Sequence, residues 1–412
     1  MMELNNLNIN LRKILDKSIS YLYIALLFSF TFSIAIRNIF LGLLFIFVII
    51  RFLINKEINI KKNEFNFYII SFLIFTFASF FVANDLELAL DRFVSPILRY
   101  LFFFYLTFSL LKKEDMISKY LNILLYGNLT FAFLGILIKY INGTNHMRGN
   151  GTGSVAAFNV FLFTALLFDK KTNKYKKILY LFGTISFSYI LFQTTSRGAV
   201  LGFLAALLVF AGFLIYYNFD SQKAKSIATI ILIFFILITP FLMPDRLINK
   251  FGNLRNVYEH NSLKTRIVMW ESSIHMIKNN PILGVGVGNY QPHYLDYIDN
   301  VSNEDLTAGS REHDHPHNMF LFIAAEQGMP SLILFIIMIF IAIKISLFNI
   351  YKYERFSFSN LIGIASLSMF IVFIVHSMVD STARYGHVGF YLLFITIINY
   401  LLYEEMSDRN EN

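Results

Sequence analysis

The residues most suited to chemistry lie in a short segment that precedes a long apolar run. The segment holds three histidines at alternate positions: His313, His315 and His317. Pro316 disfavours the α conformation in the residue before it, so this segment is predicted to be extended. Asn318 suits a helix N-cap, and a helix is predicted to begin directly after it. His317 is therefore expected at the mouth of a helix, where an imidazole can act as a general base.

Three interpretations of this histidine segment are open. It can be a polar loop that caps a membrane helix. It can be a metal site, because an extended H-x-H-x-H sequence places alternate imidazoles on one face. It can also carry a catalytic histidine at a membrane surface, and the segment alone does not decide among the three.

The helix after Asn318 carries a glycine on the same side as His317. At about 100° per residue, His317 and Gly328 share one face, with the glycine about three turns deeper. Gly328 is expected to let another helix approach closely at this depth. Pro330 is expected to end or kink the helix.

Three arginines beside apolar segments are candidates for binding phosphate: Arg148, Arg197 and Arg266. Arg197 opens an apolar run, where it either snorkels to lipid headgroups or joins the N–H groups of the helix start in a phosphate clamp. Arg148 lies in a glycine-rich loop before another apolar run and has the same two interpretations. Arg266 stands one turn before Trp270, so it either packs on the indole ring or reaches a lipid phosphate.

A long hydrophilic stretch contains one amphipathic segment and one glycine-rich turn. Apolar residues form a single helical stripe, which predicts a helix on the membrane surface: Leu263, Ile267, Trp270, Ile274 and Ile277. Residues 281–290 superficially resemble a nucleotide-binding loop. The spacing is not G-x-G-x-x-G and no helix clearly follows, so a tight, glycine-dependent turn is expected.

Further ionisable residues fall in or beside apolar runs. His376 and Asp380 are four residues apart near the end of one run, which predicts that they share a helical face. An ionisable pair at membrane depth is a candidate site. Arg99 and Glu326 also lie within apolar runs and receive no role beyond structural pairing.

The composition indicates which class of protein positions these residues. Of 412 residues, 56% are hydrophobic and 15% are charged, whereas soluble domains carry roughly 25% charged residues. The sequence predicts an all-α polytopic membrane protein with about twelve transmembrane helices and one large extracytoplasmic loop. The predicted spans are residues 19–36, 38–54, 66–83, 93–111, 117–140, 154–168, 177–193, 198–217, 226–243, 318–347, 360–379 and 387–403. Nine spans therefore fall in residues 1–243, the loop with its amphipathic helix in 244–317, and three spans with a cytoplasmic tail in 318–412.

Charge sets the predicted orientation. The net charge of +8 reflects lysines and arginines concentrated in alternate loops, such as residues 170–177, which is a topology signal and does not indicate nucleic-acid binding. With the N-terminus inside, the loop at 244–317 and its histidines face the extracytoplasmic side. The absence of cysteine excludes disulfides and thiolate metal sites. The first apolar run is predicted to be an uncleaved anchor.

The combined pattern resembles the O-antigen ligase superfamily, which also includes O-antigen polymerases and protein O-oligosaccharyltransferases. The resemblance covers roughly residues 145–390 and depends on four motifs in order: Ser196-Arg197-Gly198, Arg266 with Trp270, the glycine turn at 281–289, and His315-Pro316-His317-Asn318. The ligase signature continues from His317-Asn318 through nine residues to Gly328. It departs at Ser331, where the family has glycine, threonine or tyrosine, and this departure bears on the choice between ligase and polymerase.

The resemblance implies a GT-C-like fold and an inverting, metal-independent glycosyltransferase of lipopolysaccharide biosynthesis that uses no cofactor. The donor would be a glycan on undecaprenyl diphosphate, and the acceptor a hydroxyl of lipid A–core, at the periplasmic face of the bacterial inner membrane. The diphosphate would be bound by Arg148, Arg197 and Arg266. His317 would deprotonate the acceptor, and Asp380 would orient a catalytic group. The supporting residues would be His315, Asn318 and Gly328.

Other functions stay open beside the ligase. A surface-polysaccharide polymerase and a protein O-oligosaccharyltransferase are alternatives within the same superfamily. A transporter of lipid-linked glycans belongs to another class, and it would place polar residues near the membrane midplane and show repeat symmetry. In this sequence the polar residues concentrate at predicted outer helix ends and in one asymmetric loop. Membrane lipids are the other expected partners.

Overall fold

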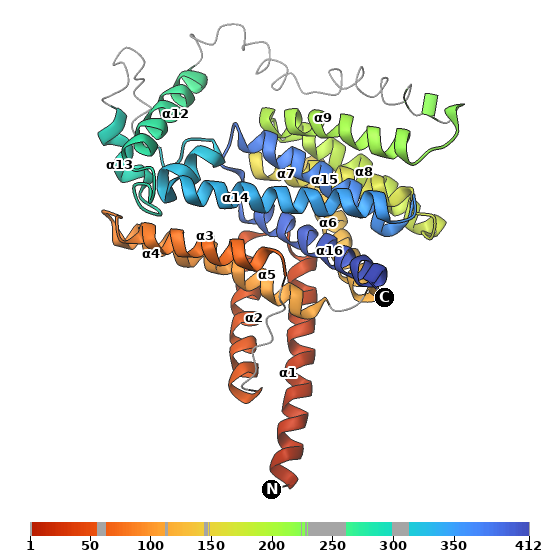
Figure 1. Cartoon of the computed structure of the whole chain (residues 1–412). Coiled ribbons are helices and arrows are strands. Elements are labelled where there is room, and N and C mark those ends of the chain that lie inside the picture. The colour runs from red at the N-terminus through yellow and green to blue at the C-terminus, as the bar shows by residue number, and fades with distance from the viewer. Residues whose placement is uncertain are drawn as a thin grey trace. The chain divides into compact units, whose positions relative to one another are not determined.

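The computed structural model describes residues 2–55, 63–111, 114–143, 147, 149–223, 225–226, 229, 261–298 and 313–411 (Figure 1). Among these residues there are helices and turns but no strands. The chain forms two compact units, one of residues 1–63 with 98–146 and the other of residues 64–97 with 147–412. The expected all-α fold is confirmed for this part of the chain.

In its described residues, the first unit contains four helices: α1 (Met2–Phe28), α2 (Ile34–Asn55), α5 (Arg99–Leu110) and α6 (Glu114–Asn142). Helix α1 packs on α2 and α6. The predicted boundary between the first two spans, near residue 37, was wrong, because α1 already ends at Phe28. Serine side chains explain the earlier break: Ser29 bonds back to the carbonyl of Ala25 at 2.7 Å, and Ser33 accepts the Ala35 N–H at 3.2 Å.

The second unit holds the remaining elements. They are α3 (Phe65–Phe80), α4 (Leu86–Arg92), α7 (Asn150–Leu167), α8 (Lys174–Gln193), α9 (Arg197–Ala211), α12 (Asn261–Asn279), α13 (Tyr290–Ile298), α14 (Met319–Lys352), α15 (Phe358–Ser377), the short η6 (Thr382–Arg384) and α16 (Gly386–Glu411). Two π-helical turns, η1 (Phe93–Leu98) and η2 (Gly212–Tyr217), continue α4 and α9. Helix α15 is central to this unit, since it packs on α7, α9, α14 and α16. The starts of α7 and α9 and the end of α15 therefore come together.

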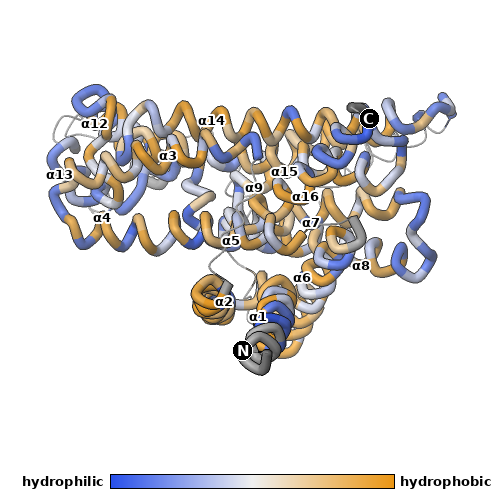
Figure 2. Tube along the Cα trace, turned by 60° about the horizontal axis from the view of Figure 1, so that its bottom comes forward, coloured by the Kyte–Doolittle hydropathy of each residue, from blue (hydrophilic) through white to orange (hydrophobic). Residues whose placement is uncertain are grey.

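Eight described helical stretches are long and apolar enough to cross a membrane: Ile34–Ile54, Leu86–Leu110, Met116–Asn142, Asn150–Leu167, Arg197–Tyr217, Met319–Lys352, Phe358–Ser377 and Gly386–Arg409. Figure 2 shows the apolar character of such helices, for example along α14. The predicted spans at 19–36, 66–83 and 177–193 fall mainly on α1, α3 and α8, which do not belong to this set. The span predicted at 226–243 lies outside the described residues. A polytopic membrane protein is thus supported, and the count of twelve stays a prediction.

Helix α14 begins and breaks where the sequence predicts. The Asn318 side chain caps it by accepting the N–H groups of Phe320 and Leu321 at 3.0 and 3.1 Å. Gly328 then interrupts the helical backbone with φ 80°, two residues before Pro330. Because proline has no N–H, the carbonyl of Glu326 would lose its helical partner at this point.

A loop, and not a second helix, fills the break in α14. The N–H groups of Val285 and Gly286 donate to the carbonyls of Ala325 and Glu326, at 2.8 and 3.0 Å. In return, the N–H of Met329 donates to the carbonyl of Pro281 at 2.8 Å. This pairing corrects the expectation that Gly328 accommodates a helix. The glycine is still required, because a Cβ there would lie 2.0 Å from the carbonyl oxygen of Ile282.

The loop itself, residues 281–289, is the expected glycine-dependent turn. Gly284, Gly286 and Gly288 all have positive φ angles, at 67°, 102° and 76°. The expectation that no helix follows was wrong, because α13 begins at Tyr290. Glu326 explains this local order, since its buried carboxylate accepts the N–H of Tyr290 at 3.2 Å.

Helix α12 confirms the predicted helix within the large hydrophilic stretch. Its buried side carries Val268, Met269 and Met276. Ile267 and Ile274, from the predicted apolar stripe, are each 41% exposed. An apolar stripe on the outer side of α12 is compatible with contact to lipid, and its place at the membrane surface stays a prediction.

Reporter fusions test the predicted orientation of the chain. A reporter fused after Lys174, within the basic loop, is expected to show the cytoplasm, because positive loops stay inside. A reporter fused after Asn279, at the end of α12, is expected to show the extracytoplasmic side. Paired alkaline phosphatase and fluorescent-protein fusions measure both. If the two positions report the same compartment, the orientation is wrong.

Candidate active site

Asp380 lies at the centre of the candidate site. Its side chain is only 1% exposed and sits in the turn between α15 and η6. The sequence predicts that Asp380 shares a helical face with His376, but α15 ends at Ser377, so Asp380 lies beyond the helix. The chain turns sharply enough to keep the pair together, with 3.9 Å between His376 Nε2 and Asp380 Oδ2.

Both oxygens of Asp380 accept hydrogen bonds. The Ser381 N–H donates to Oδ1 at 2.8 Å, and the Tyr385 hydroxyl donates to Oδ2 at 3.1 Å. His317 Nδ1 lies 3.0 Å from Oδ1. Burial opposes ionisation, but the bond to His317 and the neighbouring imidazoles outweigh it, so the pKa of Asp380 lies well below its usual range.

The ionised carboxylate determines the tautomer of His317. A carboxylate accepts but does not donate, so the proton between the two groups belongs to His317 Nδ1. The lone pair of this imidazole is therefore on Nε2, and the side chain is 27% exposed. An imidazole held in this way by a buried carboxylate is the arrangement of a general base.

Contacts from two elements fix the backbone around His317. Its φ of 49° lies in the left-handed region, which costs energy for a residue with a side chain. The indole N–H of Trp270, on α12, donates to the Pro316 carbonyl at 2.9 Å. The amide of Asn318 donates to the Met378 carbonyl at 3.1 Å. These bonds lie on either side of His317 and stabilise its unusual conformation.

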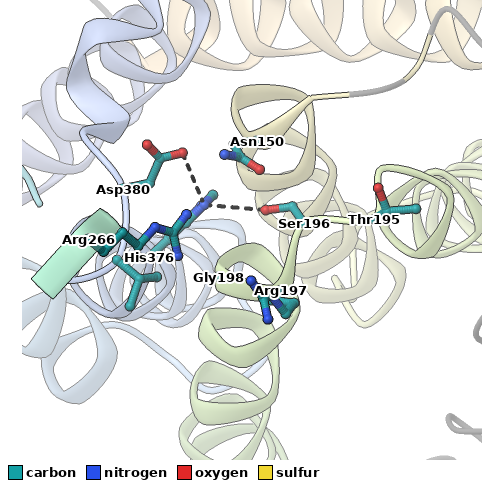
Figure 3. A pocket seen from close by; sticks show the side chains of 9 residues that line it. Asn150, Thr195, Ser196, Arg197, Gly198, Arg266, His376 and Asp380 are labelled. Carbon is teal, nitrogen blue, oxygen red and sulfur yellow. Dashed lines mark hydrogen bonds and ion pairs between the residues drawn. The ribbon is translucent and has the colours of Figure 1, made fainter. Parts of the chain in front are cut away.

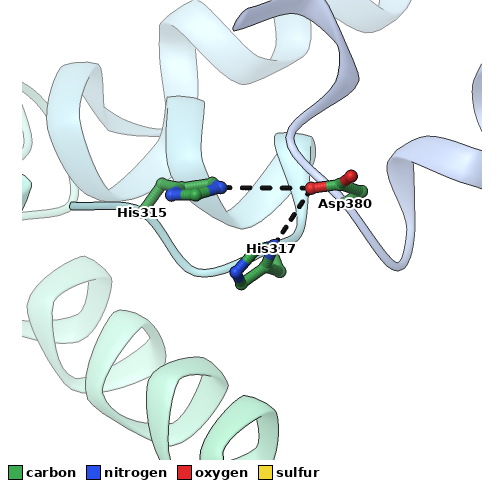
Figure 4. Close-up of side chains that lie close together, drawn as sticks. All are labelled: His315, His317 and Asp380. Atoms are coloured by element: carbon green, nitrogen blue, oxygen red, sulfur yellow. Dashed lines mark hydrogen bonds and ion pairs between the residues drawn. The ribbon is translucent and has the colours of Figure 1, made fainter. Parts of the chain in front are cut away.

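His315 lies beside His317 and belongs to the same cluster (Figure 4). The two imidazole centroids are 4.2 Å apart, and His315 Nε2 is 3.9 Å from Asp380 Oδ1. The other nitrogen of His315 lies 2.6 Å from Asp314 Oδ1, and Asp314 pairs with Arg384 at 2.5 Å. His313 is placed differently, with its ring against Tyr294. The structure therefore groups two of the three histidines with Asp380.

A polar cavity of about 150 Å³ adjoins the other side of Asp380 (Figure 3). Its lining comes from the starts of α7 and α9, from α12 and from the end of α15: Asn150, Thr195, Ser196, Arg197, Gly198, Arg266, His376, Val379 and Asp380. Gly198 permits this meeting, since a Cβ there would lie 2.4 Å from His376 Cδ2. Arg197 and Arg266, far apart in sequence, thus face one cavity.

The cavity favours an anion. Burial lowers the pKa of Arg266, the Asp380 carboxylate opposes this effect, and the guanidinium remains charged. Helix α7 starts after Gly149 without a side-chain cap, so its first N–H groups add positive potential near Asn150. The indole N–H of Trp270 donates to the Pro316 carbonyl. Arg266, one turn earlier on α12, lines the cavity. A group with several acceptor oxygens matches this lining.

His376 lines the cavity and contacts two serine hydroxyls. Its Nδ1 is 2.7 Å from the Ser154 hydroxyl on α7, and its Nε2 is 3.4 Å from the Ser196 hydroxyl that caps α9. The sequence singles out His376 but carries no signal for Ser154. Tyr385 was also missed, and burial with Asp380 nearby holds its pKa at about 12, so its hydroxyl keeps the proton that it donates.

Three further residues considered from the sequence are not among the described residues that line the cavity. Arg148 lies outside the described residues. Glu326 is buried against the loop at 281–289, away from the cavity lining. Arg99 lies in the first unit, where it is near Arg37 and Tyr100. The structure therefore gives the last two no part in the cavity.

Comparison with known protein families gives a match within the second unit. Residues 182–336 match the family model described as O-antigen ligase. A search of curated proteins found no match. The matched segment contains Arg197, Arg266, His317 and Gly328, and it confirms the resemblance seen in the sequence.

Proposed function

We propose, on the premise that this chain is an O-antigen ligase/polymerase-type membrane glycosyltransferase, that it acts as a ligase. It moves a glycan from undecaprenyl diphosphate to a hydroxyl of lipid A–core, at the outer face of the inner membrane. One observation carries the proposal: Asp380 both accepts a hydrogen bond from His317 and lines the cavity that Arg197 and Arg266 also line. A base and an anion site are thus side by side.

The base side of the site activates the acceptor. His317 Nε2 takes the proton of the acceptor hydroxyl as the oxygen attacks the anomeric carbon of the donor sugar. The bond from that carbon to the diphosphate oxygen breaks, and its electron pair leaves with undecaprenyl diphosphate. Attack from the face opposite the leaving group inverts the anomeric configuration. Asp380 stabilises the imidazolium that forms.

The cavity side stabilises the leaving group. Negative charge grows on the diphosphate as the bond breaks, and Arg197 and Arg266 supply fixed positive partners with paired N–H donors. Arg148 is assigned to the same task from the sequence. The guanidinium groups perform the charge neutralisation that a divalent metal performs in metal-dependent sites with a diphosphate leaving group.

A deletion strain tests the ligase assignment. Gel analysis of surface polysaccharide should show bare lipid A–core and accumulated polymer on the lipid carrier. The pattern of a polymerase mutant, with core that carries one repeat, would refute the ligase. Restoration by the wild-type gene is the control for the deletion itself.

Chelation should leave transfer intact. If the arginines neutralise the diphosphate, then EDTA removes nothing that the reaction needs, and the transfer rate should not fall by more than about twofold in a purified detergent assay. Loss of activity with EDTA, restored by one particular divalent ion, would support a catalytic metal. It would also mean that Arg197 and Arg266 are not the groups that neutralise the diphosphate.

Replacing Arg197 by lysine separates a phosphate clamp from a topology signal. Lysine keeps the charge but loses the bidentate fork, so we expect a transfer rate about tenfold to a hundredfold lower with normal membrane insertion. Arg409→Lys, at an exposed arginine near the C-terminus, is the matched control and should be neutral. A fully active Arg197→Lys protein would mean that Arg197 only anchors the helix at the headgroups.

A further inference from the structure

Two imidazoles and one carboxylate converge on a single point outside the cavity. His317 Nδ1 and His315 Nε2 lie 3.0 and 3.9 Å from the same oxygen, Asp380 Oδ1. One ligand atom from each of the three residues can be chosen so that all lie within 4.8 Å of one another. Figure 4 shows both rings approaching the carboxylate. The proposed reaction uses the His317 contact but gives no role to that of His315.

The tautomer of His315 places an unprotonated ring nitrogen toward the carboxylate of Asp380. Asp314 is paired with Arg384 and accepts from the other ring nitrogen, which therefore carries the proton. The lone pair of His315 then lies on Nε2, facing the Asp380 carboxylate. Two acceptor atoms face each other across 3.9 Å, and they repel unless a positive centre lies between them.

The surroundings of His315 also match those of a metal ligand. Imidazoles that bind metals commonly donate their second N–H to a carboxylate, which orients the ring and raises its basicity. Asp314 occupies this position at 2.6 Å, and it is itself held by Arg384. The side chains of His315 and His317 are 17% and 27% exposed, so an ion can reach them from solvent.

We propose that His315, His317 and Asp380 form an inhibitory binding site for a divalent transition-metal ion of the zinc class. Two nitrogen ligands and one oxygen ligand suit zinc, whereas magnesium and calcium prefer oxygen alone. Ligand-to-zinc distances of about 2.0–2.2 Å place tetrahedral ligand atoms roughly 3.3–3.6 Å apart. The His317–Asp380 pair at 3.0 Å would therefore open and the His315–Asp380 pair at 3.9 Å would close, each by about half an ångström.

The chemistry of inhibition follows from the atom that binds, and this part depends on the proposed function. Zinc takes His317 through Nδ1, so the proton on that nitrogen moves through solvent to Nε2. The ring stays neutral and releases no net proton. Nε2 no longer has a lone pair, so it cannot accept the proton of the acceptor hydroxyl. Zinc therefore inhibits transfer without occupying the arginine cavity.

Zinc binding can be measured without any transfer reaction. The full-length protein, purified in detergent without a histidine tag and stripped with EDTA, is titrated with zinc against a chromogenic chelator. We expect one tight site per chain, weakened by about tenfold to a hundredfold in Asp314→Asn and more in His315→Ala. His275→Ala, at a half-buried histidine of α12 outside the cluster, is the control and should bind as wild type does. Equal zinc affinity in wild type and His315→Ala would overturn the site.

A transfer assay then tests the inhibitory role. Transfer by wild type should fall in parallel with zinc occupancy and return on chelation. At the same zinc concentration, His315→Ala should keep its own zinc-free rate. Activation of the stripped protein by zinc would overturn inhibition in favour of a catalytic metal. If zinc binds as expected but no transfer occurs under any condition, the proposed function fails while the metal site stands.

Discussion

Replacing His317 by alanine is expected to lower the transfer rate by about 10²–10⁴-fold, the range that a general base contributes. The reason is that, in the proposed mechanism, Nε2 takes the acceptor proton, and Asp380 cannot reach the acceptor in its place because it is buried. Donor binding should persist, since Arg197 and Arg266 lie in a separate cavity. Single-turnover transfer, measured beside binding of the lipid-linked donor, separates the two effects.

His315→Ala is the comparison for this experiment. His315 is bonded to Asp314 and only approaches Asp380, so its loss should slow transfer much less than the loss of His317. Both proteins should insert into the membrane normally, because both residues lie outside the helix and are partly exposed. Equal, mild effects together with weaker donor binding in each would identify the segment as a polar cap.

Asp380→Asn is expected to have the second large effect, also about 10²–10⁴-fold on transfer. Asparagine has nearly the same shape and can still accept from His317 and Ser381 through its oxygen. It lacks the negative charge that stabilises the imidazolium after proton transfer. The substitution also removes the negative charge that interacts with Arg266. Because both arginines of the cavity remain, donor affinity should change less than turnover.

Asp314→Asn provides the matched carboxylate control. This residue also touches a histidine of the segment, but it contacts His315 and not His317. In zinc-free buffer its transfer rate should stay within about tenfold of wild type. Thermal stability in detergent, measured for both variants, checks that the buried substitution leaves the fold intact. Similar, small effects of the two substitutions would remove Asp380 from the mechanism.

The sequence predicted best those features that neighbouring residues determine. The cap by Asn318, the break at Gly328 and the positive φ angles of the turn at 281–289 each depend on a few adjacent residues. The start of α9 at Arg197, behind the Ser196 cap, is local in the same sense. A side chain that accepts a nearby N–H, or a residue that can adopt positive φ, acts within one turn of chain.

Features that depend on packing between distant segments could not be predicted. The family resemblance suggested Asp380 as an orienting residue, but nothing in the sequence paired Tyr385 with its second oxygen. The bond from Trp270 to Pro316 spans 46 residues, and the contact of Ser154 with His376 spans 222. His376 and Asp380 do not share a helical face as predicted, because α15 ends at Ser377 and does not continue to residue 380.

The repaired break in α14 has a consequence for how the outer part of the chain can move. Apolar membrane surroundings offer no water to an unpaired peptide group, and each such group costs several kcal/mol. Lifting residues 281–286 away would strip partners from Ala325, Glu326 and Met329 at once. These backbone hydrogen bonds therefore fix the segment that carries α12 and Arg266 to α14 at its C-terminal end. Any motion of α12 must therefore pivot about this backbone pairing and cannot separate residues 281–286 from α14 without breaking it.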